Sequence, residues 1–384
     1  MAPQTYFERV RSRTALRKHM GSTAPLRQWL QSNLRSASSW STTELYASRV
    51  VVRHVRGGVL QYPDPTKTGA VLTAPPEQPG EELSKIIAPL RPGEKLPTET
   101  ELVHRLGGTA GVFWAALHCC THPPAVSVPQ DRMDSWLEDT TVQLASTFLR
   151  HALIYCPLQL VSAGNINPRM LLEFSGVRQR MVATLGTGGL SFEATADGKV
   201  AVLYQNSTGH FTDRKETVAL LDAKKRVKKV REGKPIFTDQ VLGQIVGEAL
   251  ALRLSQAAKA TGLRNETIVV ISAVKHYLCF VGVHIPAAYV EKNQNRGNEE
   301  DEHGQEGEQG EQGEEDGEDG EDGEDEEDEE DEEDEEESQD EDCGEIITLR
   351  VTDWLDLSTE HCRQLACKNI AAFVNWQQKV SQSA

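Results

Sequence analysis

The chain has 384 residues, 38% of them hydrophobic, which is enough to build the core of one large domain or two small ones. Its formal net charge of −19 is unevenly distributed, because residues 299–342 hold 31 of the 59 acidic side chains and neither Lys nor Arg. The rest of the chain has 40 basic residues against 28 acidic ones, so we expect a basic folded body that carries an intensely acidic segment. No run of about 18 apolar residues occurs, which excludes a transmembrane helix, and we expect no membrane association.

The cysteines indicate the compartment. All seven are scattered, and none forms a Cys-x-x-Cys pair, a usage typical of reduced thiols in an intracellular protein of the nucleus or cytoplasm. Cys119 and Cys120 stand between two histidines, but no second pair follows at zinc spacing, so a structural role is favoured. Residues 1–36 contain seven basic side chains and one acid, Glu8, a composition that fits a disordered arm and also a mitochondrial transit peptide.

The first third of the chain shows little regular periodicity. Residues 1–40 are predicted to form a basic N-terminal arm with one helix around Pro25–Leu34. Residues 41–132 are rich in Pro and Gly, a composition that disfavours regular elements. We expect an irregular extension in which the short apolar segment Gly111–Cys120 docks on the main domain.

Residues 133–298 have the pattern of an α/β core. Asp134 can cap a helix with apolar residues at helical spacing, which Pro157 is expected to end. Glycines and an Asp-Gly pair then separate apolar segments of strand length, as between antiparallel strands. The predicted strands are Arg169–Phe174, Gln179–Leu185, Leu190–Thr195, Val200–Tyr204 and Val218–Ala223.

A second helix is predicted after these strands, with Thr238 or Asp239 as its cap, followed by strands at Thr267–Val274 and Tyr277–Ile285. Gly243 and Gly247 would let this helix approach its neighbour closely, which we expect to place Gln244 and Glu248 near the sheet.

The acidic segment interrupts this core. Residues 299–342 contain no apolar side chain to bury, and their like charges repel, so we expect a disordered insertion. Residues 343–384 are expected to complete the core. Their strand, Ile346–Val351, should pair with the strand before the insertion, and an amphipathic helix should run from about Ser358 to Val380.

The most informative segment is the predicted strand that ends in Asp222-Ala223-Lys224. Four apolar residues, Val218–Leu221, precede it, as in a central strand covered on both faces. Because side chains alternate along a strand, Asp222 and Lys224 should project from one face and Ala223 from the other. A carboxylate that holds Mg²⁺ or Mn²⁺, beside a lysine that orients or deprotonates water, suits metal-dependent hydrolysis. Taken alone, an Asp-x-Lys tripeptide on a strand occurs more often by chance than as part of a catalytic site.

A second acid, Asp197, lies between two predicted strands. The simple interpretation of Asp197-Gly198 is a hairpin turn. The functional interpretation makes Asp197 a second metal carboxylate that the sheet brings beside Asp222.

Together these segments resemble the PD-(D/E)XK nuclease superfamily, in particular its uncharacterised fungal branch. The matching pieces are Ala196-Asp197-Gly198, the strand around Leu220–Lys225, the helix around Asp239–Leu250 with its glutamine, and the strand pair around Leu172–Phe174 with Arg178 and Arg180. The first motif has alanine in place of proline, and the second acid is aspartate rather than the commoner glutamate. The resemblance covers about Met133–Val290 and Ile346–Val380.

The resemblance implies a restriction-endonuclease-like α/β fold, a mixed sheet flanked by helices, and Mg²⁺- or Mn²⁺-dependent cleavage of nucleic acid. Asp197 and Asp222 would be the metal ligands, and Lys224 would act on the water. Gln244 and Glu138 would support them, with Glu173 as the alternative helix acid. Because some members of the superfamily bind without cutting, the rival prediction is a catalytically inactive interaction protein.

A run of basic residues follows this strand. Lys225, Arg226, Lys228, Lys229 and Arg231 would contact phosphates if the site binds nucleic acid, whereas a solvated loop is the simpler interpretation. Two roles for the acidic segment remain open. It would compete with nucleic acid for this basic face, or it would serve as a solubilising insert or bind a basic protein.

Overall fold

The computed structural model describes most of the chain outside the acidic segment. The described residues are 4–32, 36–65, 71–72, 80–88, 99–122, 130–162, 169–186, 189–224, 229–257, 266–295 and 346–382. The predicted disordered insertion, residues 299–342, therefore lies outside them, as do Lys225, Arg226 and Lys228.

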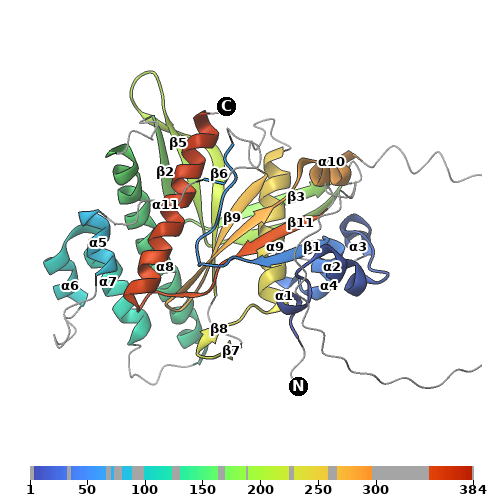
Figure 1. Cartoon of the computed structure of the whole chain (residues 1–384), viewed down its shortest axis with the longest axis horizontal. Helices are drawn as coiled ribbons and strands as arrows, with labels where there is room; N and C mark the ends of the chain where they lie inside the picture. The colour runs from blue at the N-terminus through green and yellow to red at the C-terminus, as the bar shows by residue number, and fades with distance from the viewer. Residues whose placement is uncertain are drawn as a thin grey trace, which may run out of the picture.

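An eight-stranded mixed sheet forms the centre of the described structure (Figure 1). Seven strands follow one another in the order β1-β11-β10-β9-β6-β5-β2, and β12 pairs with β10. Their bounds are β1 (Val50–His54), β2 (Met170–Ser175), β5 (Gly198–Gln205), β6 (Phe211–Lys224), β9 (Thr267–Val274), β10 (Tyr277–His284), β11 (Ile347–Val351) and β12 (Leu355–Asp356). Two small hairpins complete the strands: β3 (Gln179–Leu185) with β4 (Leu190–Ala196), and β7 (Val230–Arg231) with β8 (Lys234–Pro235).

The strand directions gather four carboxyl ends at one edge of the sheet. Strand β6 is parallel to β9, and β1 is parallel to β11. Because β10 is antiparallel to both β9 and β11, the strands β1, β11, β9 and β6 all run the same way. In α/β proteins the carboxyl ends of parallel strands are where ligands bind.

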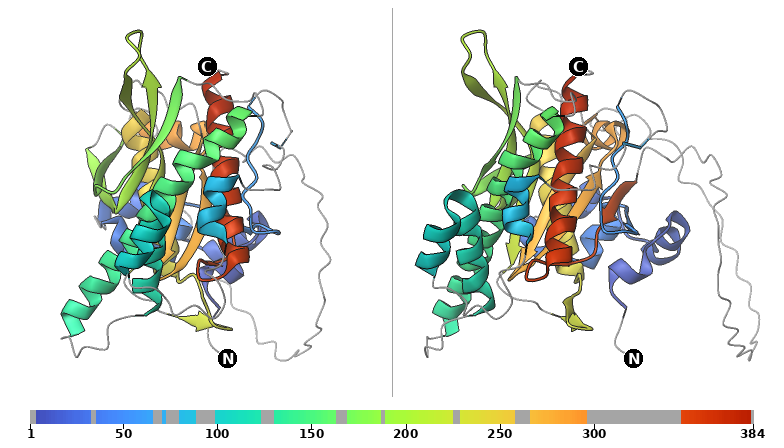
Figure 2. Two further views of the ribbon diagram at one scale, coloured as in Figure 1. Left: turned by 90° about the vertical axis from the view of Figure 1, so that its left-hand side faces the viewer. Right: turned by 60° about the vertical axis from the view of Figure 1, so that its left-hand side comes forward.

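Helices cover both faces of the sheet (Figure 2). On one face, α9 (Asp239–Ala257), α10 (Ala287–Asn295), the N-terminal helices and the β3–β4 hairpin bury one hydrophobic core. On the other face, α8 (Gln130–Ser162) and α11 (Glu360–Gln382), with α5 (Glu81–Ile87) and α7 (Gly108–Thr121), bury a second core. The predicted α/β architecture, a mixed sheet flanked by helices, is confirmed. No helix within the described ranges has the length and apolarity needed to cross a membrane.

The prediction of an N-terminal arm over residues 1–40, with one helix around Pro25–Leu34, is correct for the helix, which is α3 (Leu26–Ser32), and wrong for the rest of the part that the structure describes. That part forms α1 (Tyr6–Arg9), α2 (Arg13–Met20), α3 (Leu26–Ser32) and the 3₁₀ helix η1 (Ala37–Ser39). Tyr6, Leu16 and Leu30 are buried in the core beside α9, although arginines separate them in the sequence. The few apolar residues of this segment are widely spaced among basic ones, so they do not form a recognisable helical pattern in the sequence. They are buried only because α9, far away in the chain, packs against them.

The extension over residues 41–132 also contains more regular structure than predicted. It supplies α4 (Thr42–Ala47), the edge strand β1, α5, α6 (Glu99–Leu106) and α7, which packs on α8. Among the described strands, β1 pairs only with β11, which lies almost 300 residues later in the chain. The sequence around β1 therefore could not predict this partner.

The remaining elements follow the predicted pattern, except that β6 begins at Phe211 rather than Val218, that β7, β8 and β12 were not predicted, and in three further respects. Helix α8 begins at Gln130 and continues through Pro157 to Ser162 rather than ending at the proline. Helix α10 was not predicted. A side chain at Gly243 would meet the backbone of Trp40 at 2.6 Å, so the neighbour that the α9 glycines approach is η1 and its C-terminal end rather than the sheet.

Candidate active site

The acid and lysine of β6 meet the polar face of α9 at the carboxyl end of the strand. Leu220 belongs to the core on the α9 side, and Leu221 and Ala223 belong to the opposite core, so Asp222 and Lys224 face α9. Lys224 Nζ lies 2.7 Å from Asp222 Oδ1. The structure thus holds the ammonium and the carboxylate side by side, which is the arrangement that strand alternation predicts.

Gln244 of α9 joins these two side chains. Its Nε2 donates to Asp222 Oδ1 at 3.0 Å and to Glu248 Oε1 at 2.7 Å. Its Oε1 accepts a hydrogen bond from Lys224 Nζ. Because one amide binds both the carboxylate and the ammonium, Gln244 fixes their relative position.

Two carboxylate oxygens of this network have no donor in the described part of the chain. Asp222 Oδ2 and Glu248 Oε2 are buried and make no hydrogen bond there. The side chain of Asp222 is only 1% exposed, and Glu248 is fully buried. An unsatisfied buried carboxylate oxygen is costly, so a cation, a bound water or a proton at these atoms would stabilise the site.

Asp197 lies beside Asp222 and outside a hairpin turn. Strand β4, which precedes it, pairs with β3, whereas β5, which follows it, pairs with β2 and β6. Asp197 therefore stands where the chain passes from the small hairpin into the main sheet, and the hairpin-turn interpretation is wrong. Its Oδ2 accepts a hydrogen bond from the N–H of Ala223 at 2.9 Å, and its side chain is 14% exposed.

Glu138 reaches this site through an arginine. Arg178 Nη2 lies 3.1 Å from Glu138 Oε1, and Arg178 Nε lies 3.4 Å from Asp197 Oδ1. Helix α8 thus brings Glu138 near Asp197 rather than into contact with the Lys224 amine. The alternative acid, Glu173, is exposed on β2, two strands away from β6.

Burial and mutual repulsion raise the pKa values of two carboxyl groups. Desolvation raises the pKa of Asp197, and the charges of Asp222 and Glu138 add to the effect, while the Ala223 N–H and Arg178 oppose it. Desolvation also raises the pKa of Glu248 well above its ordinary value, with further contributions from Asp222 and Asp197, and Lys224 opposes the shift. Carboxyl groups crowded in a buried site favour a bound cation or a retained proton.

The raised pKa of Glu248 predicts a pH effect on stability. Between the ordinary pKa of 4.5 and the higher pKa in the folded state, the folded chain binds more protons than the unfolded chain. Stability is therefore lost as the pH rises through this window. Replacing Glu248 with glutamine removes the titration, so the free energy of unfolding of the variant, relative to the wild type, should increase with pH.

Urea unfolding at a series of pH values measures this difference. The matched control is Glu291→Gln, which changes an exposed glutamate on α10. A difference between E248Q and the wild type that does not vary with pH would show that Glu248 does not titrate as the structure indicates.

The two aspartates have the ligand chemistry of a magnesium site. Among the residues that the structure describes, no group of three or more His, Cys, Asp or Glu side chains is arranged to hold a metal ion. Mg²⁺, however, is usually held by one or two carboxylates, with waters and substrate phosphates as its other ligands. Asp222 has one oxygen without a donor among the described residues, whereas Asp197 Oδ2 accepts from the Ala223 N–H and Asp197 Oδ1 pairs with Arg178, so this pair would hold Mg²⁺ or Mn²⁺ only with Arg178 displaced.

A small pocket opens at the carboxyl edge of the sheet. It has a volume of about 230 Å³, and its lining includes His54 at the end of β1 and Asp353 just after β11. Arg11, Arg231 and Lys234 carry positive charge in this lining, and Glu8, Glu232 and Asp353 carry an equal negative charge. Arg231 is exposed on the β7–β8 hairpin, where its Nη1 lies 2.6 Å from Glu8 Oε1, and Lys229 is exposed just before the hairpin.

Three aromatic rings stack beside these cations. Phe7 and Phe237 have ring centroids 5.5 Å apart, and those of Phe237 and Trp354 are 4.9 Å apart. The sequence showed few aromatics within the basic run, because these rings come from three separate segments. Their proximity could not be read from local spacing.

Glu248 and Arg178 are further members of the site that the predicted set did not include. The only signal for Glu248 was its position one helical turn after Gln244. For Arg178, the link to Glu138 depends on the packing of α8 against the strands.

No protein-family model matches this chain, and a search among curated proteins finds no significant match. The resemblance to nucleases therefore depends on the motifs and on the contacts described above.

Proposed function

We propose that the chain is a metal-dependent, nuclease-like protein of restriction-endonuclease-like fold that cleaves nucleic-acid phosphodiesters. One observation carries the proposal: Asp222 and Lys224 stand side by side at the carboxyl end of β6, held by Gln244, with Asp197 hydrogen-bonded to the intervening residue. This combination joins oxygen ligands for a hard cation with an amine that can orient water.

Each side chain has a role in this proposal. Asp197 and Asp222 would hold Mg²⁺ or Mn²⁺, which when bound neutralises charge on the phosphate and activates water. Lys224 is held by Asp222 and Gln244, so its ammonium can orient the attacking water by hydrogen bonding. Gln244 positions the lysine and the aspartate together, and Glu138 pairs with Arg178, which also pairs with Asp197.

A pocket whose lining mixes three basic and three acidic side chains lies beside the basic run that would contact nucleic acid. It lies at the same sheet edge as Lys224, because β1 and β11 end there as β6 does. Arg11, Arg231 and Lys234 would contact phosphates, with Lys229 beside them and Lys225, Arg226 and Lys228 in the adjoining part of the chain outside the described residues.

A second candidate function is favoured by one contact. Arg178 forms ion pairs with both Glu138 and Asp197, and its guanidinium competes with a metal ion for Asp197. A chain with this fold that keeps Arg178 in place would bind nucleic acid, or a basic protein through its acidic segment, without cutting.

The two functions differ in a cleavage assay. The full-length chain should convert plasmid DNA, linear DNA or RNA to shorter products with Mg²⁺ or Mn²⁺, and EDTA should stop the reaction. Gel-shift binding in EDTA measures nucleic-acid affinity separately. Binding without cleavage on any of these substrates would overturn the nuclease proposal and support the interaction protein.

A further inference from the structure

The pocket at the carboxyl edge of the sheet has an aromatic wall. Phe7, Phe237 and Trp354 line it together, and their rings stack in a row with interplanar angles of 23° and 26°. Phe7 is the partly exposed member of this row, whereas Phe237 and Trp354 are 5% and 8% exposed. A planar ligand can therefore pack against Phe7, which the two buried rings hold in place.

Trp354 adds an unused hydrogen-bond donor to this wall. Its indole Nε1 is buried and has no hydrogen-bond partner within the described ranges. An indole N–H can only donate, and a buried donor without an acceptor is costly. A ligand that brings an acceptor to this nitrogen would remove that cost. The ring nitrogens and carbonyl oxygens of nucleobases are acceptors of this kind.

Four of the charged groups in the lining form two pairs. Arg231 Nη1 lies 2.6 Å from Glu8 Oε1, and His54 Nε2 lies 3.0 Å from Asp353 Oδ1. Each of these carboxylates thus already has a partner in the protein, so neither places an unpaired negative charge in the pocket.

Three charged side chains of the lining are left without a partner among the described residues, namely Arg11, Lys234 and Glu232. They present donors and an acceptor together rather than a large surplus of positive charge. A phosphate alone would favour such a surplus, whereas a base flanked by phosphates requires both kinds of group. The charge of the lining therefore suits one nucleotide of a strand better than a free phosphate.

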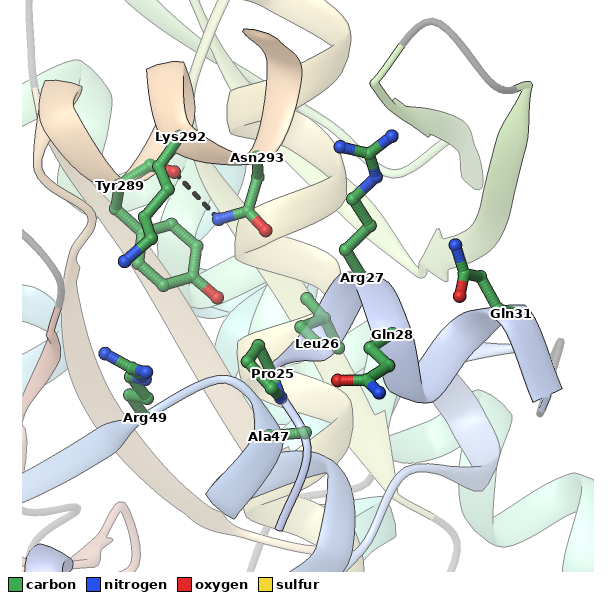
Figure 3. A pocket seen from close by; sticks show the side chains of 10 residues that line it. All are labelled: Pro25, Leu26, Arg27, Gln28, Gln31, Ala47, Arg49, Tyr289, Lys292 and Asn293. Carbon is green, nitrogen blue, oxygen red and sulfur yellow. Dashed lines mark hydrogen bonds between the residues drawn. The ribbon is translucent and has the colours of Figure 1, made fainter. Parts of the chain in front are cut away.

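A larger pocket between α3, the end of α4 and α10 differs in this respect (Figure 3). Its volume is about 310 Å³, and its three cations are Arg27, Arg49 and Lys292. Each of these cations interacts with another group of the protein. The pocket at the sheet edge is thus the one with cations that are available to a ligand.

Trp354 is level with the acid of β6 on the same face of the sheet. Strand β12 reaches β6 through β10 and β9, and these pairings place Leu355 in one row with Ala223. The residues just before them, Trp354 and Asp222, therefore occupy the next row, and both lie on the α9 side. Since neighbouring strands are about 4.8 Å apart, this row separates the two residues by roughly 14 Å. A short stretch of single strand spans this distance.

We propose that the pocket at the sheet edge holds an unpaired base, so that the chain acts on single-stranded nucleic acid in preference to an intact duplex. This inference rests on the proposed nuclease function, because it assigns the pocket to the strand whose phosphate reaches the site at the end of β6. Phe7 packs against the base, and Trp354 donates to one of its acceptors. Arg11 and Lys234 contact the flanking phosphates. The volume of about 230 Å³ suits one base and is too small for a base pair with its backbones.

Fluorescence anisotropy in EDTA tests this inference without cleavage. The probes are a labelled single-stranded oligonucleotide, the same strand annealed to its complement, and an abasic strand of equal length, which keeps the phosphates and lacks the bases. The full-length chain should bind the intact strand about tenfold more tightly than the abasic strand, the effect of one base–aromatic stack. It should also bind the intact strand more tightly than the duplex. Equal affinity for the intact and abasic strands would overturn the inference.

Variants test whether the base lies in this pocket. Phe7→Leu keeps an apolar side chain and removes the flat ring, and Trp354→Phe keeps a ring and removes the N–H donor. Each should lower the preference for the intact strand several-fold and leave the affinity for the abasic strand unchanged. Lys234→Gln should weaken both strands equally, and Phe211→Leu, at an exposed ring on β6, should change neither. A preference that persists in both F7L and W354F would show that the base binds elsewhere.

The outcomes distinguish this inference from the nuclease proposal. Thermal unfolding shows which variants are folded, and the preference of the wild type for the intact strand requires no variant. Metal-dependent cleavage that is faster on an intact duplex than on single strands would overturn the base pocket and leave the nuclease proposal in place. Base-dependent binding without cleavage would support the pocket and overturn the nuclease proposal.

Discussion

Replacing Lys224 with alanine is expected to lower metal-dependent cleavage by about 10²–10⁴-fold, the range for loss of a residue that orients or transfers a proton. Lys224 Nζ lies 2.7 Å from Asp222 Oδ1 and also donates to Gln244, so no other amine in the described structure is held in the same place. Single-turnover cleavage at saturating Mg²⁺ measures the effect without interference from product release.

The substitution also has a structural side effect, which must be measured separately. Without the ammonium, the buried carboxylate of Asp222 keeps only the amide of Gln244 as a donor, so some loss of stability is expected. Thermal unfolding and nucleic-acid binding in EDTA show whether K224A is folded. Lys368→Ala, on the far face of the sheet, is the matched lysine control. Cleavage by folded K224A at the wild-type rate would remove Lys224 from the mechanism.

Trp40→Ala is expected to destabilise the fold by about 3–5 kcal/mol, as for other fully buried aromatic residues. Trp40 is 0% exposed, and its ring lies 4.9 Å from that of Phe192, centroid to centroid. It also packs in the notch that Gly243 and Gly247 leave on α9, where added Cβ atoms would lie within 2.6–3.2 Å of η1 or Trp40. Equilibrium urea unfolding gives the free energy directly.

A surface aromatic provides the control for this measurement. Phe211→Ala changes a ring that is 43% exposed on β6 and should alter the free energy of unfolding far less. If W40A were as stable as F211A, the segment before α4 would not be part of the core, and the prediction of an N-terminal arm over residues 1–40 would hold instead.

The sequence predicted the parts of the site that depend on one element each. Alternation along β6 places Asp222 and Lys224 together, and helical spacing places Gln244 and Glu248 on one face of α9. These relations are local, since they follow from the side-chain periodicity of a single strand or a single helix. The apolar run Val218–Leu221 was strong enough to indicate a central strand.

The parts that the sequence did not predict depend on contacts between distant segments. Tyr6 donates its backbone N–H to Asp239 at 2.7 Å and its hydroxyl to the Val50 carbonyl at 2.6 Å, which ties α1 to both α9 and β1. The basic composition of this region predicted an arm. The residues near Tyr6 in the sequence give no indication that Asp239 and Val50 bind it. Strand β1 and the ion pairs by which Arg178 links α8 to Asp197 were not predicted for the same reason, since both depend on partners distant in the sequence.

The position of β11 has a consequence for biosynthesis. It lies between β10 and β1, so among the described strands β1 has no other partner in the sheet. β1 can therefore pair only after the nearly 300 residues that separate it from β11 have been translated. During that interval the hydrogen-bonding edge of β1 lacks its partner, so the nascent chain exposes an unpaired strand edge that chaperones can bind.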